Sequence, residues 1–336
     1  MNSTFKEIAV PKAIRIHEQG PPEVMKWEDV ELPPPGAGEV QMRHEVAGLN
    51  YIDTYHRSGV YKLPLPSGIG SEAAGVVEAV GDGVTEFKRG DRVCYASGTP
   101  LQPIASYSEA RNIPAARLVK IPDGINSDMV AAMMLKGMTV SYLITRTYKV
   151  KPGETVLFHA AAGGVGLIAC QWLKAMGVTT IGTAGSDEKC ELAKAHGAQY
   201  CINYNKEDFV ARVKEITGGK GVPVVFDGVG KDTFDRSLEC LSMYGMMVSF
   251  GNASGSVPPV NIAPQLKGHL FLTRPSLQPY TAARQDLLTL ANELFDVVKA
   301  GKVKIDINQR YPVKDAVQAH KDLESRKTTG STVLMM

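Results

Sequence analysis

The sequence has few features that would tie it to nucleic acids or to membranes. Its 336 residues contain 37 Lys and Arg against 35 Asp and Glu, a formal net charge of +2, and no block of basic residues. A general nucleic-acid-binding or membrane-surface role therefore has no electrostatic support. No apolar run is long enough to cross a bilayer. The stretch MNSTFKEIAV lacks a cationic segment followed by an apolar run, so we expect no secretion signal.

Cysteines are also scarce, and their spacing excludes two common roles. Five are scattered along the chain with no C-x-x-C pair, which argues against a disulfide framework and against a cysteine-rich zinc lobe. The simplest location is therefore a reducing cytoplasm. Hydrophobic residues make up 44% and charged residues 21%, as in globular chains. The length indicates two domains.

The pattern of apolar residues changes near residue 153. Before it, short alternating runs such as EVQMRHEVAGL, bounded by Gly and Pro, predict an antiparallel, partly barrel-like β domain. After it, apolar runs such as ETVLFHA and VTTIGTA alternate with amphipathic segments, which is typical of a doubly wound parallel sheet. The tail no longer alternates, so we expect it to return to the first domain. The predicted domains are 1–137 with 275–336, and 138–274. The stretch 97–110 predicts a loop.

The stretch HAAAGGVG follows a predicted strand and precedes a predicted helix. Ala161, Gly163 and Gly166 occupy the three positions of a dinucleotide-binding fingerprint, with Gly164 and Val165 completing the turn. Small residues there allow backbone amides to approach a pyrophosphate at the helix N-terminus. Alanine at the first position is compatible if it keeps a negative φ. The alternative is a glycine-rich turn without a ligand.

The end of the next strand bears on which nicotinamide is bound. NAD enzymes usually carry Asp or Glu there to bind the ribose hydroxyls, whereas this chain has Ala184 and Gly185. Ser186 and Lys189 follow, offering a hydroxyl, a helix N-terminus and a cation to a 2′-phosphate. The sequence therefore predicts NADPH. The acidic pair at 187–188 lies close to the expected phosphate and argues the other way, and Lys189 alone is equally consistent with a solvated helix lysine.

Four stretches, GLNYIDTYHRSG, GIGSEAAGVVEAVG, HAAAGGVGLIACQW and VSFGNASG, resemble the quinone oxidoreductase branch of the medium-chain dehydrogenase/reductase superfamily, the zinc-independent, ζ-crystallin-like branch. The resemblance extends over nearly the whole chain. It implies an α/β protein with a GroES-like β-barrel catalytic domain, a Rossmann doubly wound parallel sheet and a cleft between them. It also implies a homodimer joined at the edge strands of the Rossmann sheets, around His269–Thr273.

The resemblance implies that no catalytic zinc is bound. Zinc-dependent relatives have a cysteine ligand where this chain has Asn50, and a histidine ligand where it has Ser71. A catalytic zinc needs about three protein ligands, and two of the family's are replaced. Isolated histidines such as His44, His56 and His159 are usually packed or solvated residues, so we assign no metal.

By the same resemblance, Asn50, Asp53 and Tyr55 line the site near the nicotinamide. Tyr55 is a candidate proton donor or stacking partner, the alternative being an ordinary core aromatic, and Asp53 would orient its neighbours or simply form a turn. Further cofactor contacts are expected from the linking helix, the ends of later strands and the C-terminal tail: Lys136, Thr139, Tyr204, Phe250, Gly251, Asn252, Leu272, Arg274 and Arg326.

These features together predict an oxidoreductase that reduces quinones with NADPH and without zinc. Two alternatives stay open: an NADPH-dependent reductase of α,β-unsaturated aldehydes or ketones, and an NADPH-binding protein with little catalysis and a structural or RNA-interacting role. A small-molecule quinone or enone is the expected partner, with no specific nucleic acid and no membrane.

Overall fold

The computed structural model describes residues 10–97 and 105–336, which form two compact units. The first unit runs to Leu135 and resumes at Ile307–Met336, and the second is Lys136–Asp306. The N-terminal stretch 1–9 and residues 98–104 of the predicted loop lie outside the described range. No helix in the described range is long and apolar enough to cross a membrane.

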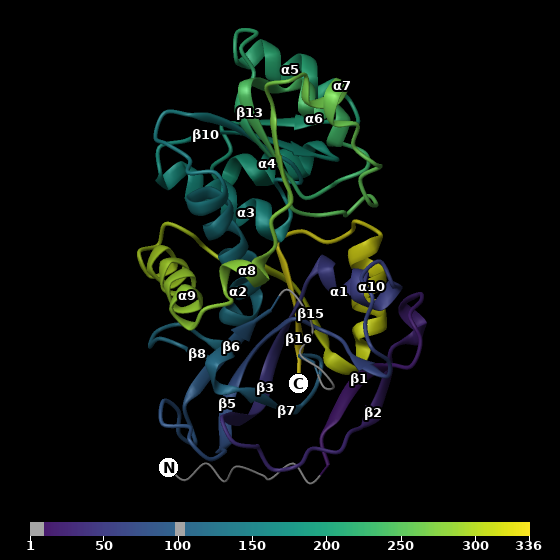
Figure 1. Cartoon of the computed structure of the whole chain (residues 1–336), viewed down its shortest axis with the longest axis vertical. Helices are drawn as coiled ribbons and strands as arrows, with labels where there is room; N and C mark the ends of the chain where they lie inside the picture. The colour runs from purple at the N-terminus through teal and green to yellow at the C-terminus, as the bar shows by residue number, and fades with distance from the viewer. Residues whose placement is uncertain (1–9, 98–104) are drawn as a thin grey trace. The chain divides into compact units, whose positions relative to one another are not determined.

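The first unit is built on a mixed sheet with strand order β15-β16-β3-β5-β6-β8, with β7 pairing to β3. All of its pairs are antiparallel except β15 with β16. The expected antiparallel β domain is confirmed. The C-terminal strand β16 lies against β3 (Figure 1), so the tail completes this sheet. The strands are β3 (Glu39–Leu49), β5 (Glu72–Val80), β6 (Arg92–Ala96), β7 (Ala110–Pro114), β8 (Val119–Lys120), β15 (Ile307–Pro312) and β16 (Ser331–Met335).

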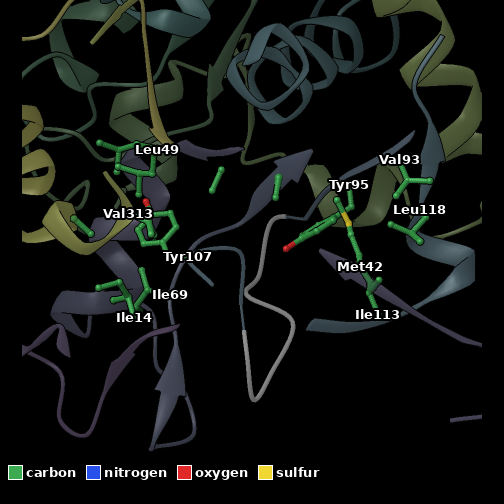
Figure 2. Packing of buried hydrophobic residues seen from close by; sticks show 14 of the residues in the cluster. Ile14, Met42, Leu49, Ile69, Val93, Tyr95, Tyr107, Ile113, Leu118 and Val313 are labelled. Carbon is green, nitrogen blue, oxygen red and sulfur yellow. The ribbon is translucent and has the colours of Figure 1, made fainter. Parts of the chain in front are cut away.

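A smaller sheet of order β2-β1-β4 and several short helices complete the first unit. Its core is drawn from segments far apart in the sequence, as the labelled side chains in Figure 2 show. Tyr107 belongs to this core and is buried with no exposed surface. The remaining elements are β1 (Lys12–Ile16), η1 (Pro22–Val24), β2 (Lys26–Asp29), α1 (Tyr51–Ser58), β4 (Ser67–Gly68), η2 (Ala115–Arg117), η4 (Val313–Asp315) and α10 (Ala316–Glu324).

The second unit contains a parallel sheet with strand order β11-β10-β9-β12-β13-β14. In chain order this is 3-2-1-4-5-6, the arrangement of a dinucleotide-binding doubly wound sheet, so the predicted fold class is confirmed. The strands are β9 (Thr155–Phe158), β10 (Thr179–Ala184), β11 (Tyr200–Asn203), β12 (Val222–Asp227), β13 (Leu241–Ser249) and β14 (Phe271–Thr273). The helices are α3 (Gly164–Ala175), α4 (Asp187–Ala195), α5 (Phe209–Ile216), α6 (Phe234–Glu239), α7 (Ile262–Leu266), α8 (Leu277–Tyr280) and α9 (Arg284–Lys299).

The predicted domain boundary at 274/275 differs from the structure, which places residues 275–306 in the second unit. The reason is packing against the part of α2 (Ser127–Tyr142) that follows the first boundary, and against the π-helical turn η3 (Leu143–Thr147). The ring of Tyr280 stacks on that of Tyr142, with centroids 4.4 Å apart. On α9, the Leu294 side chain fills the space where a Cβ of Gly137 would lie. The amphipathic pattern of 281–300 shows one apolar face but not which element covers it.

Candidate functional site

Helix α1 starts directly after β3 and carries the predicted catalytic residues. Asn50 is its N-cap and forms a capping box with Asp53, whose Oδ2 accepts from the Asn50 backbone amide at 2.9 Å. Gly59 ends the helix in the left-handed region, at φ 91°. The capping box fixes the start of α1, and it brings Asn50, Asp53 and Tyr55 together on this short helix.

The side chain of Asn50 is held by a residue that the sequence analysis did not select. Its Nδ2 donates to Oε1 of Glu72 at 2.7 Å, and Oε2 of Glu72 accepts from the Leu135 backbone amide at 2.6 Å. Glu72 has no exposed surface. A Cβ on Gly48 would lie only 2.3 Å from Glu72 Oε1, so the glycine makes room for the carboxylate. The sequence does contain a signal that could have identified Glu72, since it is a charged residue at the start of the otherwise apolar run EAAGVV.

Asp53 is a buried carboxylate surrounded by donors. Besides the Asn50 amide, it accepts from the Ser71 hydroxyl at 2.6 Å and from the Tyr107 hydroxyl at 2.9 Å. Burial raises its pKa to about 6, against the opposing effect of these hydrogen bonds. Because Asp53 is 0% exposed, of the roles considered from the sequence the geometry favours orienting its neighbours.

The same network continues from α1 to the C-terminal helix α10. The Tyr107 hydroxyl lies 3.4 Å from Nε2 of His320, whose Nδ1 lies 3.3 Å from Nη1 of Arg57. Arg57 in turn makes two hydrogen bonds, of 2.7 and 2.9 Å, to the carboxylate of Glu324. Burial, helped by the Arg57 charge, lowers the pKa of His320 to about 3, so the imidazole is neutral. Arg57 and His320 therefore tie α1 to α10 within the first unit.

The ring of Tyr55 packs beside the rings of two other tyrosines. Its ring centroid is 5.6 Å from that of Tyr51 and 5.4 Å from that of Tyr61. The side chain is 8% exposed. This position is compatible both with a proton donor at the surface of the unit and with a core aromatic, so both interpretations remain predictions.

The three histidines considered as metal ligands are buried and packed. His44 contacts the Ser108 carbonyl at 2.6 Å, and His159 lies 2.8 Å from hydroxyls on both sides. His56 packs beside the ring of Tyr61. Burial lowers the pKa of all three, to about 3 for His44 and about 4 for His56. Within residues 10–97 and 105–336, no three His, Cys, Asp or Glu side chains gather as a metal site would require.

In the second unit, the glycine turn joins β9 to α3. Ala161 donates its amide to the Thr183 carbonyl of β10 at 3.0 Å, and Gly163 caps the helix. A Cβ on Gly166 would lie 2.4 Å from the Ala160 carbonyl oxygen, so only glycine fits there. The left-handed residue of the turn is Ala160, at φ 54°, and not Ala161. The first amides of α3 have no partner within the helix, and this arrangement of close backbone and helix N-terminus fits the pyrophosphate of a dinucleotide.

Several predicted residues meet at the carboxyl end of β10. The Tyr204 hydroxyl lies 2.7 Å from where a Cβ of Gly185 would be, and Ser186 caps α4 by accepting from the Lys189 amide at 3.3 Å. The structure therefore brings Gly185, Ser186, Lys189 and Tyr204 to one place. The phenol of Tyr204 and the N-terminus of α4 are donors of the kind that bind a phosphate.

Asp187 and Glu188, the two acidic residues that argued against NADPH, both accept hydrogen bonds from neighbouring side chains. Asp187 accepts from Nδ2 of Asn203 at 2.7 Å and forms an ion pair with Lys206. The hydrogen bonds from Lys206 and Asn203 lower the pKa of Asp187, and a hydrogen bond from Ser186 lowers that of Glu188. The Asp187 charge is thus balanced by a cation that the sequence analysis missed, because Lys206 lies beyond the next strand.

The predicted residues after β13 pack against the end of β12. A Cβ on Gly251 would lie 2.4 Å from the Gly228 carbonyl oxygen, and a Cβ on Gly228 would lie 3.0 Å from the Phe250 ring. Arg274, just after β14, donates to the Ser249 carbonyl at 2.9 Å. Phe250, Gly251 and Arg274 therefore gather at the carboxyl ends of neighbouring parallel strands, where ligands of such sheets bind. Asn252 follows directly in the chain.

Four predicted residues lie apart from these groups. Lys136 and Thr139 are on α2 and both are buried, and Thr139 hydrogen-bonds Tyr142. Leu272 lies within β14 with a side chain that is 37% exposed, on the edge of the sheet. Arg326 follows α10 and belongs to the first unit, so its contact with a 2′-phosphate stays a prediction.

Comparison with known proteins covers nearly the whole chain. Residues 36–123 match the model of the alcohol dehydrogenase GroES-like domain, and residues 164–293 match that of the zinc-binding dehydrogenases. The chain is 51% identical to the quinone oxidoreductase of Pseudomonas aeruginosa, over 96% of this chain and 99% of that protein. It is 45% identical to the 2-haloacrylate reductase of a Burkholderia species, over 95% of this chain and 97% of that protein. The crystal structure of Escherichia coli quinone oxidoreductase complexed with NADPH superposes with a TM-score of 0.93 at 49% identity, covering 97% of this chain and 100% of that one.

Proposed function

The chain belongs to the quinone oxidoreductase family of the medium-chain dehydrogenase/reductase superfamily, and we propose that it reduces quinones with NADPH and without a zinc ion. The observation that carries the proposal is the identity of about half of all residues with quinone oxidoreductases over essentially their full length. At that similarity the fold and the local geometry of a site are shared closely enough to support a common chemistry.

NADPH supplies the hydride when bound, and the acceptor takes one further proton from water or a side chain. In this chain the amides of Gly163–Gly166 would hold the pyrophosphate, and Ser186, Lys189 and Tyr204 would hold the 2′-phosphate. From the first unit, Asn50 and Tyr55 would contact the nicotinamide or the acceptor. Asp53, being buried, holds Asn50 and α1 in position.

The proposal that the reaction needs no zinc is supported by the donor set and does not rest on the name of the matched domain. Asn50 and Ser71 offer an amide and a hydroxyl where zinc-dependent relatives have a thiolate and an imidazole, and zinc prefers the latter. Both side chains are already used: Asn50 donates to Glu72 and Ser71 donates to Asp53. The reaction therefore depends on positioning and hydrogen bonds.

One further candidate substrate class has a specific observation in its favour. The 45% identity with a 2-haloacrylate reductase supports reduction of an activated carbon–carbon double bond conjugated to a carbonyl or carboxyl group. The same hydride donor would serve, with the acceptor carbon in place of a quinone oxygen or ring carbon.

We also propose a homodimer and a cytoplasmic location. β14 is the last strand in the sheet order, and Phe271 on it is 55% exposed. Exposed apolar residues also occur on β13 and α7 of the same unit: Met243, Tyr244 and Ile262. An apolar edge strand is suited to pairing with a second copy. The five cysteines are all free thiols, which agrees with a reducing compartment.

The direct test follows NADPH oxidation by absorbance with 1,4-benzoquinone, 1,2-naphthoquinone, 2-chloroacrylate and an alkenal as acceptors. NADH replaces NADPH in parallel, and each assay is repeated with a metal chelator. We expect chelator-resistant quinone turnover that is much faster with NADPH. Turnover of 2-chloroacrylate alone would assign the second substrate class, and NADPH binding without turnover of any acceptor would refute the proposed activity.

A further inference from the structure

Glu72 is a buried carboxylate that the proposed reaction does not yet use. We infer that Glu72 is a positioning residue, which sets the orientation of the Asn50 carboxamide and fastens it to the backbone where the first unit ends. The inference rests on the proposed function only in giving Asn50 a role beside the cofactor or acceptor. The hydrogen bonds themselves are independent of that role.

The chemistry of the three partners fixes the direction of each hydrogen bond. An ionised carboxylate only accepts, and a backbone amide only donates. Oε2 of Glu72 accepts from the Leu135 amide at 2.6 Å, and Oε1 lies 2.7 Å from Nδ2 of Asn50. The Asn50 amide must therefore turn its NH2 group toward Glu72, because its oxygen would face a second acceptor there. Glu72 thus favours one of the two amide orientations that the side-chain shape alone would permit, the same one that lets the Asn50 side-chain oxygen accept from the Asp53 amide in the capping box.

Burial makes this selection strong. Glu72 is 0% exposed and Asn50 is 5% exposed, so water does not compete for these groups and the hydrogen bonds to the charged acceptor gain strength. The chain also keeps space for the carboxylate, since a Cβ on Gly48 would lie 2.3 Å from Oε1 and 2.1 Å from the Ala131 carbonyl oxygen. A buried charge is costly, and an apolar residue at the head of β5 would have avoided that cost.

The second hydrogen bond of Glu72 goes to the backbone amide of Leu135, at the point in the chain where the first unit ends. Leu135 is the last residue of the first unit, and Lys136, a predicted cofactor contact, is the first residue of the second. One carboxylate therefore holds both the predicted catalytic amide and the backbone from which the second unit begins. A change at Glu72 is expected to disturb the orientation of Asn50 and leave the glycine turn and the β10 phosphate site, which are wholly in the second unit, unchanged.

The test uses Glu72→Gln, which preserves size but presents one donor and one acceptor. Either the Leu135 hydrogen bond or the present orientation of Asn50 must then be given up. We expect kcat with a quinone to fall about 10- to 100-fold, the effect of a misplaced reacting group, with the dissociation constant of NADPH, measured by its fluorescence, changed by less than about twofold. Glu78→Gln, on the same strand but paired with Arg43 away from α1, is the matched control and should leave kcat unchanged.

A double-mutant cycle separates positioning from a general structural role. If Glu72 acts through Asn50, then adding Glu72→Gln to Asn50→Ala causes no further loss of kcat. An equal loss in both backgrounds would overturn the inference, and so would a lowered unfolding temperature of Glu72→Gln with unchanged kcat.

A donor–acceptor exchange tests the hydrogen bonds without any turnover. Asn50→Asp alone places two carboxylates together and should lower the unfolding temperature. When Glu72→Gln is added, the introduced glutamine can accept from Leu135 and donate to the new carboxylate, so the double variant should unfold at a higher temperature than Asn50→Asp. Should the wild type reduce no acceptor, the proposed function fails while this thermal comparison still decides whether Glu72 holds Asn50. No recovery in the double variant would overturn the inference.

Discussion

The methyl group of Ala161 occupies the space that a side chain on Gly182 would need. A Cβ built on Gly182, in β10, would lie 2.7 Å from the Cβ of Ala161 in the glycine turn. Alanine replaces the first glycine of the dinucleotide fingerprint in this chain, and the neighbouring strand compensates with a glycine of its own. The two residues therefore form a matched pair in the tightly packed region beneath the turn.

Gly182→Ala should destabilise the protein by about 1–3 kcal/mol, the usual cost of overpacking a tight core. The double variant Ala161→Gly/Gly182→Ala should recover part of that loss, because it moves the methyl group from one residue to the other. Urea unfolding followed by circular dichroism measures both. Additive effects of the two substitutions would contradict direct packing.

Lys189→Met should raise the KM for NADPH about tenfold and leave that for NADH nearly unchanged. A cation near the 2′-phosphate is worth roughly one charged hydrogen bond, which corresponds to such a factor. Steady-state kinetics with both nucleotides tests this. Lys194→Met, on the same helix but paired with Glu191, is the control. An equal rise of both KM values would place Lys189 away from the phosphate.

Lys206→Met should weaken the preference for NADPH over NADH, although we do not expect the Lys206 side chain to contact the cofactor. Its loss leaves the Asp187 carboxylate, close to the proposed phosphate site, without its ion-pair partner. Since both side chains are exposed, we expect a decrease of about two- to fivefold in the ratio of kcat/KM for NADPH to that for NADH. The decrease should shrink at high salt, where surface charges are screened. A salt-independent change would indicate a structural effect instead.

Buried histidines should weaken the fold at acid pH. The pKa values of His44 and His56 lie near 3 and 4 in the folded chain, below their ordinary value of 6.5. Their pH-dependent contribution to the free energy of unfolding is therefore fully present above pH 6.5, and it is lost as the pH falls toward those folded-state pKa values. Asp53 acts in the opposite direction. Its folded pKa of about 6 exceeds its ordinary 3.8, so its contribution is present at low pH and is lost as the pH rises through 6.

Asp53→Asn should therefore steepen the loss of stability on acidification between about pH 6 and pH 4. Urea unfolding across this range compares the slopes of the variant and the wild type. Parallel curves for Asp53→Asn and the wild type would show that Asp53 titrates normally in the folded chain.

Phe271→Asp should shift the protein from dimer to monomer, because it places a charge on the exposed edge of β14. Light scattering coupled to size-exclusion chromatography measures the mass. Leu65→Asp, at an exposed apolar residue of the first unit, should have no effect. A wild-type mass equal to that of one 36.2 kDa chain would exclude the dimer.

Local patterns in the sequence were sufficient to predict the type of sheet in each unit. The alternation of short apolar runs with amphipathic segments identified the parallel sheet, and the spacing of Ala161, Gly163 and Gly166 identified the strand–turn–helix unit that the structure shows. These features can be recognised in the sequence because each depends only on residues that are close together along the chain. The periods of strands and helices repeat within a few residues, and a tight turn restricts the size of the few residues that form it. The missing carboxylate after Ala184 is equally local, and the family's NADPH complex agrees with it.

The contacts that position the site depended on tertiary structure. Asn50 and Glu72 are separated by 22 residues, and Leu135 follows 63 residues after Glu72. The sequence around each of these residues therefore does not predict that they are in contact. The same holds for Asp187 with Lys206, and for α9, whose apolar face could have covered either unit. By itself the sequence determined the two types of sheet, the glycine turn and the absence of an acid beside it. Only the folded chain decided which buried carboxylate holds Asn50, which lysine balances Asp187 and which unit receives α9, because each of those outcomes depends on which distant segments are brought into contact.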